Sequence, residues 1–279
     1  MLRSGAMKPP MKSLADCPRA TLAAIRGVLT DIDETVSTEG HLTAEAYAAM
    51  AALKKAGLLV IPVTGRPAGW CDLMARFWPV DAVIGENGAF WMWHDDPKDK
   101  KGPRKLRTRF IQSDAERADG RRRLEAVQAD VLREVPGAAI ASDQPYRLAD
   151  LAIDFCEDVP PLPMAEVVRI VGIFERHGAQ AKVSSIHVNG WFGDYDKLTT
   201  TRTMMAELFG VDLDREAAHY VFVGDSPNDS PMFDLFPNGV GVANVRDFVQ
   251  TMPMPPWITR SRSGAGFIEL AEALIAARS

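Results

Sequence analysis

Short apolar runs, separated by polar turns and amphipathic segments, recur along the chain. Four of these runs have the length of strands and little polar alternation: 25–30, 58–63, 80–84 and 220–223. Such runs are typical of parallel strands that are covered on both faces. After the first run, Thr43 is an N-cap candidate, and apolar positions then recur at helical spacing until Gly57. The pattern predicts an α/β fold with a doubly wound, Rossmann-like parallel sheet.

The pattern changes at His94, where a stretch rich in Asp, Lys, Pro and Gly begins. Ser113 to Glu116 then has capping-box spacing at the start of a helix. Further strands are expected at 138–141, 148–155 and 183–188, and Asn189-Gly190 is expected to form a tight turn. We therefore expect an α+β domain at residues 94–190, inserted into a core of residues 21–93 and 191–279, with residues 1–20 as a loose N-terminal leader.

The composition is that of an ordinary globular protein, with 279 residues, 47% hydrophobic and 25% charged. A net charge of -5 without a basic block argues against nucleic acid as the main partner. The three cysteines lack the paired spacing of zinc sites, which favours a reducing, cytoplasmic location. No apolar run approaches the roughly 18 residues of a membrane-spanning helix, and no signal-peptide pattern is present. Monomer and homodimer both stay open.

Two carboxylates, those of Asp31 and Asp33, directly follow the first apolar run. They are therefore expected at the carboxyl end of a strand, where open α/β sheets bind ligands. Ionising two such close carboxylates is costly unless a cation or hydrogen-bond donors lie nearby, which predicts a divalent metal. The ordinary alternative is a turn in which both aspartates are helix-capping residues.

Three later segments favour the metal. They are Val63-Thr64-Gly65-Arg66-Pro67, Asp194-Tyr195-Asp196-Lys197 and Gly224-Asp225-Ser226-Pro227-Asn228-Asp229. Together with Asp-x-Asp-x-Thr at 31–35, and in this order, they resemble the four motifs of the haloacid dehalogenase-like (HAD) superfamily. The stretch 84–89, Ile-Gly-Glu-Asn-Gly-Ala, and the position of the insert resemble the Cof-like branch, which includes sucrose-phosphate and mannosyl-3-phosphoglycerate phosphatases. The resemblance covers about residues 22–92 and 191–275 and implies a HAD core with an inserted cap domain.

The resemblance implies a role for each matching residue. Asp31 would be the nucleophile and Asp33 the general acid and base, whereas Thr64 and Lys197 would bind the phosphoryl group. Oxygen-only ligands favour Mg²⁺ as the cofactor. The predicted metal site consists of Asp31, the backbone carbonyl of Asp33, Asp225 and Asp229, although Asp229 and Asn228 could instead hold Lys197. Glu34 stands where the superfamily commonly has glycine.

Further residues are expected to contact the substrate. From the motifs these are Thr64, Gly65, Arg66, Asn87, Lys197 and Asn228. Tyr146 and Arg147 are added because they lie in a polar, turn-prone stretch between two expected strands, for which an ordinary solvated loop is the alternative. If they contact the substrate directly, their replacement should weaken hydrolysis of the best substrate and leave hydrolysis of a small generic phosphate ester nearly unchanged.

These roles together describe an Mg²⁺-dependent phosphatase that acts on a small phosphorylated metabolite, with a sugar phosphate as the first expectation. An aspartyl-phosphate would be the intermediate. A phosphomutase of the same branch would share the first half-reaction, and a non-catalytic phosphometabolite sensor is a third reading, which the fold alone does not exclude.

Overall fold

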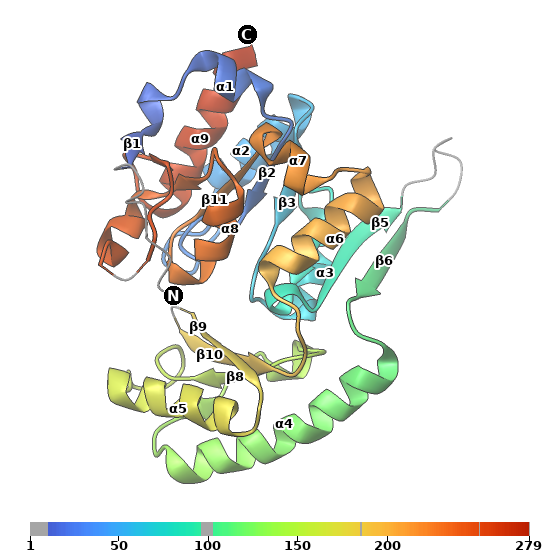
Figure 1. Ribbon diagram of the computed structural model, residues 1–279, viewed down its shortest axis with the longest axis vertical. Coiled ribbons are helices and arrows are strands. Elements are labelled where there is room, and N and C mark those ends of the chain that lie inside the picture. Colours follow the sequence, from blue (N-terminus) through green and yellow to red (C-terminus); the bar gives the residue numbers. More distant parts are fainter. Residues whose placement is uncertain (1–10, 96–102, 185, 251, 279) are drawn as a thin grey trace, which may run out of the picture. The chain divides into compact units, whose positions relative to one another are not determined.

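The computed structural model describes residues 11–95, 103–184, 186–250 and 252–278 (Figure 1). Its chain divides into two compact units. The first comprises Met1–Pro62, Trp78–Asp81 and Met205–Ser279, and the second comprises Val63–Phe77 and Ala82–Met204. The expected domain boundaries at residues 94 and 190 differ from this division and stay a prediction. Within the described residues, no helix is both long and apolar enough to cross a membrane.

A six-stranded sheet forms the centre of the first unit, in the order β1-β13-β12-β11-β2-β3. Its strands are β1 (Lys12–Ser13), β2 (Gly27–Thr30), β3 (Leu59–Pro62), β11 (Tyr220–Gly224), β12 (Val240–Gly241) and β13 (Trp257–Ile258). Every neighbouring pair is parallel. The α/β class with a parallel sheet, predicted from the apolar runs, is thereby confirmed.

Helices pack against this sheet and complete the core of the first unit. They are α1 (Arg19–Ala24), α2 (Ala44–Lys55), α7 (Leu213–Glu216), α8 (Ser230–Leu235) and α9 (Ser263–Arg278). The hydroxyl of Thr43 accepts the N–H of Ala46 at 3.2 Å, so α2 begins at the predicted cap. Met50 and Leu53 of α2 then pack with Leu270 of α9 against the sheet.

The N-terminal segment differs from the expected loose leader. Residues 1–10 lie outside the described part of the chain, but β1 pairs with β13, and a 3₁₀ turn follows at Leu14–Asp16. Leu14 is buried in the core of the first unit. Residues 12–20 are therefore not the loose leader that was expected, because a short strand and two buried side chains, those of Leu14 and Cys17, attach this segment to the sheet.

The second unit contains two antiparallel sheets. The three-stranded sheet consists of β4 (Val83–Gly85), β5 (Phe90–Asp95) and β6 (Lys105–Phe110), and the four-stranded sheet has the order β7-β8-β10-β9. Strands of the latter are β7 (Ala139–Ile140), β8 (Leu151–Asp154), β9 (Gln180–Val183) and β10 (His187–Trp191). Its helices are α3 (Ala68–Phe77), α4 (Asp114–Glu134), α5 (Met164–Arg176) and the first residues of α6 (Lys197–Phe209).

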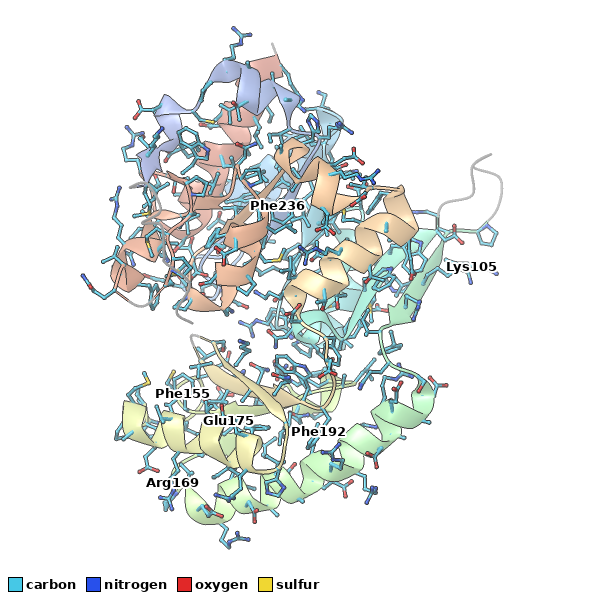
Figure 2. The ribbon with its side chains drawn as sticks, in the orientation of Figure 1. Lys105, Phe155, Arg169, Glu175, Phe192 and Phe236 are labelled. Carbon is cyan, nitrogen blue, oxygen red and sulfur yellow. The ribbon has the colours of Figure 1, made fainter. Side chains whose placement is uncertain are left out.

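One hydrophobic core of the second unit lies between the four-stranded sheet and the helices α4 and α5 (Figure 1). Leu151, Ile153 and Phe155 alternate along the chain and all enter this core. Phe192 enters it too, and Figure 2 labels this residue and Phe155. The predicted capping box is present, since Ser113 and Glu116 exchange side-chain and backbone hydrogen bonds at the start of α4.

The predicted turn at Asn189-Gly190 is wrong, because both residues lie inside the buried strand β10. The chain reverses earlier, between Val183 and His187, where the Ser184 hydroxyl accepts the His187 N–H at 2.9 Å. Tertiary contacts explain the difference. A Cβ at Gly190 would overlap the ring of Phe174, and the amide of Asn189 donates to Asp150 at 3.2 Å.

Two glycine substitutions, one in this core and one at an exposed position of α5, should have opposite effects. Gly190→Ala should lower the free energy of unfolding by about 1–3 kcal/mol, because the new methyl group must displace Phe174. Gly172→Ala, in the middle of α5 with no atom near the new Cβ, should raise it by about 0.5–1 kcal/mol. Urea denaturation of both variants measures the difference, and equal effects would contradict the packing described for β10.

Candidate active site

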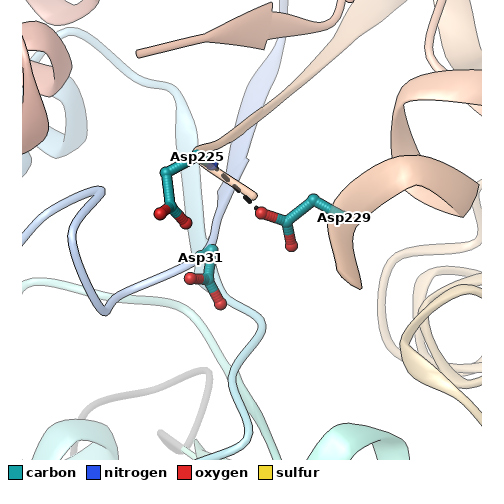
Figure 3. A group of neighbouring side chains, drawn as sticks. All are labelled: Asp31, Asp225 and Asp229. Carbon is teal, nitrogen blue, oxygen red and sulfur yellow. Dashed lines mark hydrogen bonds between the residues drawn. The ribbon is translucent and has the colours of Figure 1, made fainter. Parts of the chain in front are cut away.

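Three aspartates gather at one edge of the parallel sheet. Asp31 follows β2 and Asp225 follows β11, and these neighbouring strands are paired in parallel, so their carboxyl ends meet. The Asp31 N–H donates to the carbonyl of Val223 at 2.9 Å and continues this pairing beyond β2. One carboxylate oxygen each of Asp31, Asp225 and Asp229 lies within 4.8 Å of the others (Figure 3).

The backbone around β11 explains why Asp229 reaches this edge. Asp229 ends the 3₁₀ turn Pro227–Asp229, and its carboxylate accepts the N–H of Asp225 at 3.1 Å. A Cβ at position 224 would overlap that carboxylate, so only glycine fits there. The hydroxyl of Thr35 donates to Asp225 at 3.4 Å, and Asn228 accepts from Ser226 at 2.8 Å.

This donor set fits a magnesium ion. The relative exposures of Asp31, Asp225 and Asp229 are only 5%, 7% and 0%. Buried carboxylates at such spacing favour a bound cation, and ligands that are all oxygen suit Mg²⁺. The Asp33 side chain does not belong to this cluster, which agrees with the expectation that its backbone carbonyl is the ligand; that contribution stays a prediction.

Glu34 occupies a backbone conformation that favours glycine, with φ at 54°. Its side chain is anchored within the first unit, because the hydroxyl of Ser263 donates to its carboxylate at 2.8 Å. The amide of Asn244 also donates to the Glu34 carbonyl at 3.3 Å. These contacts explain how a residue other than glycine holds the left-handed conformation at this position of the loop.

In the second unit, Thr64, Gly65 and Arg66 form a loop that the turn at residues 86–88 supports. The N–H of Thr64 donates to Ile84, and the N–H of Asn87 donates to the Thr64 carbonyl, at 2.9 and 3.1 Å. The Thr64 hydroxyl accepts the N–H of Arg66 at 3.0 Å. Among the described residues, the buried Nδ2 of Asn87 has no hydrogen-bond partner, which leaves a donor beside Gly65 for a ligand.

The remaining predicted residues have different environments in the second unit. The buried guanidinium of Arg147 donates to Asp143, to Asp150 and to the carbonyl of Gly65. Tyr146, by contrast, is 60% exposed. Lys197 is 6% exposed and begins α6.

Residues that sequence reasoning did not assign to the site surround Arg66. Its guanidinium lies 4.5 Å from the ring centroid of Trp70 and 3.8 Å from Glu157. The Nε2 atom of His187 lies 2.8 Å from Glu157, and His187 is buried. The available signal was a histidine near the end of the expected strand 183–188, which does not distinguish a buried ring from an exposed one.

Burial lowers the pKa of His187 from 6.5 to about 4, and the charges of Arg147 and Arg66 also lower it, whereas Asp143 and Asp154 raise it. The folded protein therefore keeps His187 neutral while the unfolded chain takes up a proton below about pH 6.5. The free energy of unfolding should fall on this account as the pH drops from about 6.5 toward 4.

His187→Gln should remove this loss. Between about pH 7 and about pH 5, the free energy of unfolding of His187→Gln should decrease by about 1–2 kcal/mol less than that of the wild type. Denaturant unfolding at both pH values measures it, with His41→Gln, at an exposed position, as the matched control. An unchanged pH dependence would show that His187 is protonated in the folded protein.

No family model and no curated protein sequence matches the chain. Solved structures do match. The sucrose-phosphatase of Synechocystis, in complex with sucrose and phosphate, is 14% identical, with 90% of this chain and 98% of that chain covered and a TM-score of 0.61. A putative HAD/Cof-like hydrolase of Plasmodium vivax is 16% identical, with 92% and 99% covered and a TM-score of 0.64. The trehalose-6-phosphate phosphatase C-terminal domain of C. albicans is 10% identical, with 92% and 95% covered and a TM-score of 0.68. The chain therefore has the fold of HAD-type, Cof-like hydrolases, as the four motifs predicted.

Proposed function

We propose that the protein is an Mg²⁺-dependent phosphatase that hydrolyses a small phosphorylated metabolite, with a sugar phosphate as the preferred class. The observation that carries this proposal is the buried cluster of Asp31, Asp225 and Asp229 at the strand ends of a HAD-type fold. The similarity to a sucrose-phosphatase and a trehalose-6-phosphate phosphatase supports the choice of a sugar phosphate. In such a reaction the protein supplies a nucleophile, balances phosphoryl charge and protonates the leaving oxygen.

The chain carries a candidate for each of these tasks. A carboxylate oxygen of Asp31 attacks phosphorus, the bond to the alcohol oxygen breaks, and Asp33 donates a proton to that oxygen. Asp33 then removes a proton from water, the water oxygen attacks phosphorus, and inorganic phosphate leaves as Asp31 is restored. The hydroxyl of Thr64 and the ammonium of Lys197 bind the phosphoryl oxygens.

The metal site and the substrate contacts complete the proposal. Asp31 and Asp225, the Asp33 carbonyl and Asp229 would hold Mg²⁺, which supplies positive charge against the phosphoryl oxygens when bound. The proposed substrate contacts are Thr64, Gly65, Arg66, Asn87, Tyr146, Lys197 and Asn228. Arg147, which the sequence predicted as a further contact, is left out because all three of its guanidinium nitrogens donate to partners within the protein. The predicted cap, residues 94–190, would carry the determinants that distinguish one phosphate ester from another.

A phosphomutase is the second candidate, because it would form the same aspartyl-phosphate and return the phosphoryl group to the sugar. It would require a sugar bisphosphate for turnover, and a phosphatase would not. A screen of phosphorylated metabolites with Mg²⁺, read as release of inorganic phosphate with and without bisphosphate, separates the two. A non-catalytic sensor would release phosphate from no compound of this screen.

Asp31→Asn should lower kcat on the best substrate of this screen to below about 1% of the wild-type value, because an amide cannot serve as the nucleophile. The fold should persist, as judged by an unchanged circular dichroism spectrum. Asp16→Asn, at an exposed position in the same unit, is the matched control and should keep full activity. Substantial turnover by pure Asp31→Asn protein would exclude Asp31 as the nucleophile.

Removal of Mg²⁺ by a chelator should abolish phosphate release, and excess Mg²⁺ should restore it, while Ca²⁺ should inhibit because its coordination is looser. Mg²⁺ should also raise the melting temperature of the wild type by mass action but not that of Asp225→Ala. Full activity in excess chelator, or equal thermal protection of both proteins, would contradict the metal site.

A further inference from the structure

A single buried carboxylate, that of Glu86, connects two distant segments of the second unit. It accepts the N–H of Ala68 at 3.0 Å, at the start of α3. It also accepts the N–H groups of Leu148, Ala149 and Asp150, at 2.9, 2.6 and 3.1 Å. Glu86 has a relative exposure of 0%. Four backbone donors are thus directed at one side chain.

Backbone strain accompanies these bonds. Glu86 and the next residue, Asn87, both have positive φ angles, 45° and 56°. Such a conformation costs roughly 1–2 kcal/mol for a residue other than glycine and persists only where the surroundings enforce it. The hydrogen bonds of the Glu86 side chain supply that enforcement, and they act next to Asn87, whose amide lies against Gly65.

Arg147 forms a second connection between the same two segments. Its Nη1 donates to the carbonyl of Gly65 at 3.1 Å and to both oxygens of Asp150, at 3.0 and 3.1 Å. Its Nε and Nη2 donate to both oxygens of Asp143, at 3.0 and 3.1 Å. All three guanidinium nitrogens therefore have partners within the protein, and the side chain is 1% exposed.

The carboxyl groups in this cluster outnumber its one cation, and hydrogen bonds from backbone N–H groups stabilise that of Glu86. Arg147 carries one positive charge against the carboxylates of Glu86, Asp143 and Asp150. Burial raises the pKa of Glu86, and the charge of Asp150 raises it further, whereas the N–H of Leu148 and the charge of Arg147 lower it. Apolar residues of similar volume could stabilise a fold equally well, so a buried polar group of this size favours a role in fixing geometry.

We propose that Glu86 and Arg147 are positioning residues that set the geometry of the 64–66 loop, and that Arg147 does not contact the substrate. Glu86 holds the turn beneath the loop, and Arg147 holds the Gly65 carbonyl. This inference rests on the proposed function, in which the 64–66 loop binds the phosphoryl group that all substrates share. Loss of either residue should therefore slow hydrolysis of every phosphate ester by a similar factor.

Direct contact by Arg147, the expectation from the sequence, has a different consequence. A side chain that recognises the sugar would matter for the best substrate and be dispensable for a small ester such as p-nitrophenyl phosphate. A purely structural role has a third consequence, because it would lower the melting temperature and leave kcat/KM of the folded protein unchanged. The three possibilities can be separated with one set of variants.

The test uses Glu86→Gln and Arg147→Lys in the full chain. Glutamine keeps one oxygen but presents an NH₂ group to backbone N–H donors, and lysine keeps the charge but loses the planar fork. For both variants we expect kcat/KM to fall at least about tenfold for p-nitrophenyl phosphate and by a similar factor for the best sugar phosphate. Inhibition by inorganic phosphate should weaken in parallel.

Glu116→Gln is the matched control, because Glu116 also accepts a backbone N–H, that of Ser113, in the same unit but at the start of α4. It should leave all three kinetic quantities unchanged. Rates are measured well below the melting temperature of each variant. Retention of p-nitrophenyl phosphate hydrolysis within about twofold of the wild type would overturn the proposal, whether or not sugar phosphate hydrolysis is lost.

Amide hydrogen exchange gives a readout that does not depend on activity. Glu86→Gln should speed exchange in peptides covering residues 64–68 and 148–150, and Glu116→Gln should not. Unchanged exchange at 64–68 would also overturn the proposal. If the wild type hydrolyses no phosphate ester at all, the proposed function fails, and hydrogen exchange alone decides whether Glu86 holds the loop.

Discussion

Mutual repulsion of buried carboxylates is the constraint on which the arrangement of the first unit depends. Asp31, Asp225 and Asp229 each place an oxygen within 4.8 Å of the others. Two unit charges at about 4 Å repel by roughly 4 kcal/mol at an effective dielectric constant of about 20. That is a large part of the 5–15 kcal/mol by which domains are stable. The parallel pairing of β2 with β11 and the glycine at 224 nonetheless keep the three carboxylates together. The proposed cation would offset this repulsion.

The second unit contains buried carboxylates as well, but they are stabilised by hydrogen-bond donors of the protein itself. Glu86 is surrounded by backbone N–H groups, and Asp143 and Asp150 bind the guanidinium of Arg147. Within the described residues, the clustering of three or more potential metal ligands occurs only at the strand ends of the first unit. The two acidic clusters therefore suit different tasks. The carboxylates of the first unit suit a metal ion, and those of the second unit suit the positioning of a loop.

The sequence predicted those features that depend on local patterns. Thr43 and Ser113 are recognisable caps because an N-cap side chain accepts a backbone N–H only two or three residues further along the chain, and both were found as predicted. Asp31 and Asp225 could be placed at strand ends because each follows an apolar run. Asn189-Gly190 was misread because its turn signal is local, whereas the ring of Phe174 and the carboxylate of Asp150, which decide its conformation, are remote in sequence. The partners of Glu86 and Arg147 were not predictable for the same reason.

The two loops that carry the proposed chemistry share one physical device. Glu34, in the loop after β2, and Glu86, in the turn beneath residues 64–66, both have positive φ and both use their own carboxylate to hold that conformation. Glycine would adopt the same angles without strain, but it would also leave them freely, because it adds backbone entropy to the loop. A glutamate with fixed hydrogen-bond donors restricts the loop to one geometry at the cost of local strain. In a reaction whose rate depends on placing a nucleophile and a phosphoryl group within fractions of an ångström, that restriction is worth more than the strain it requires.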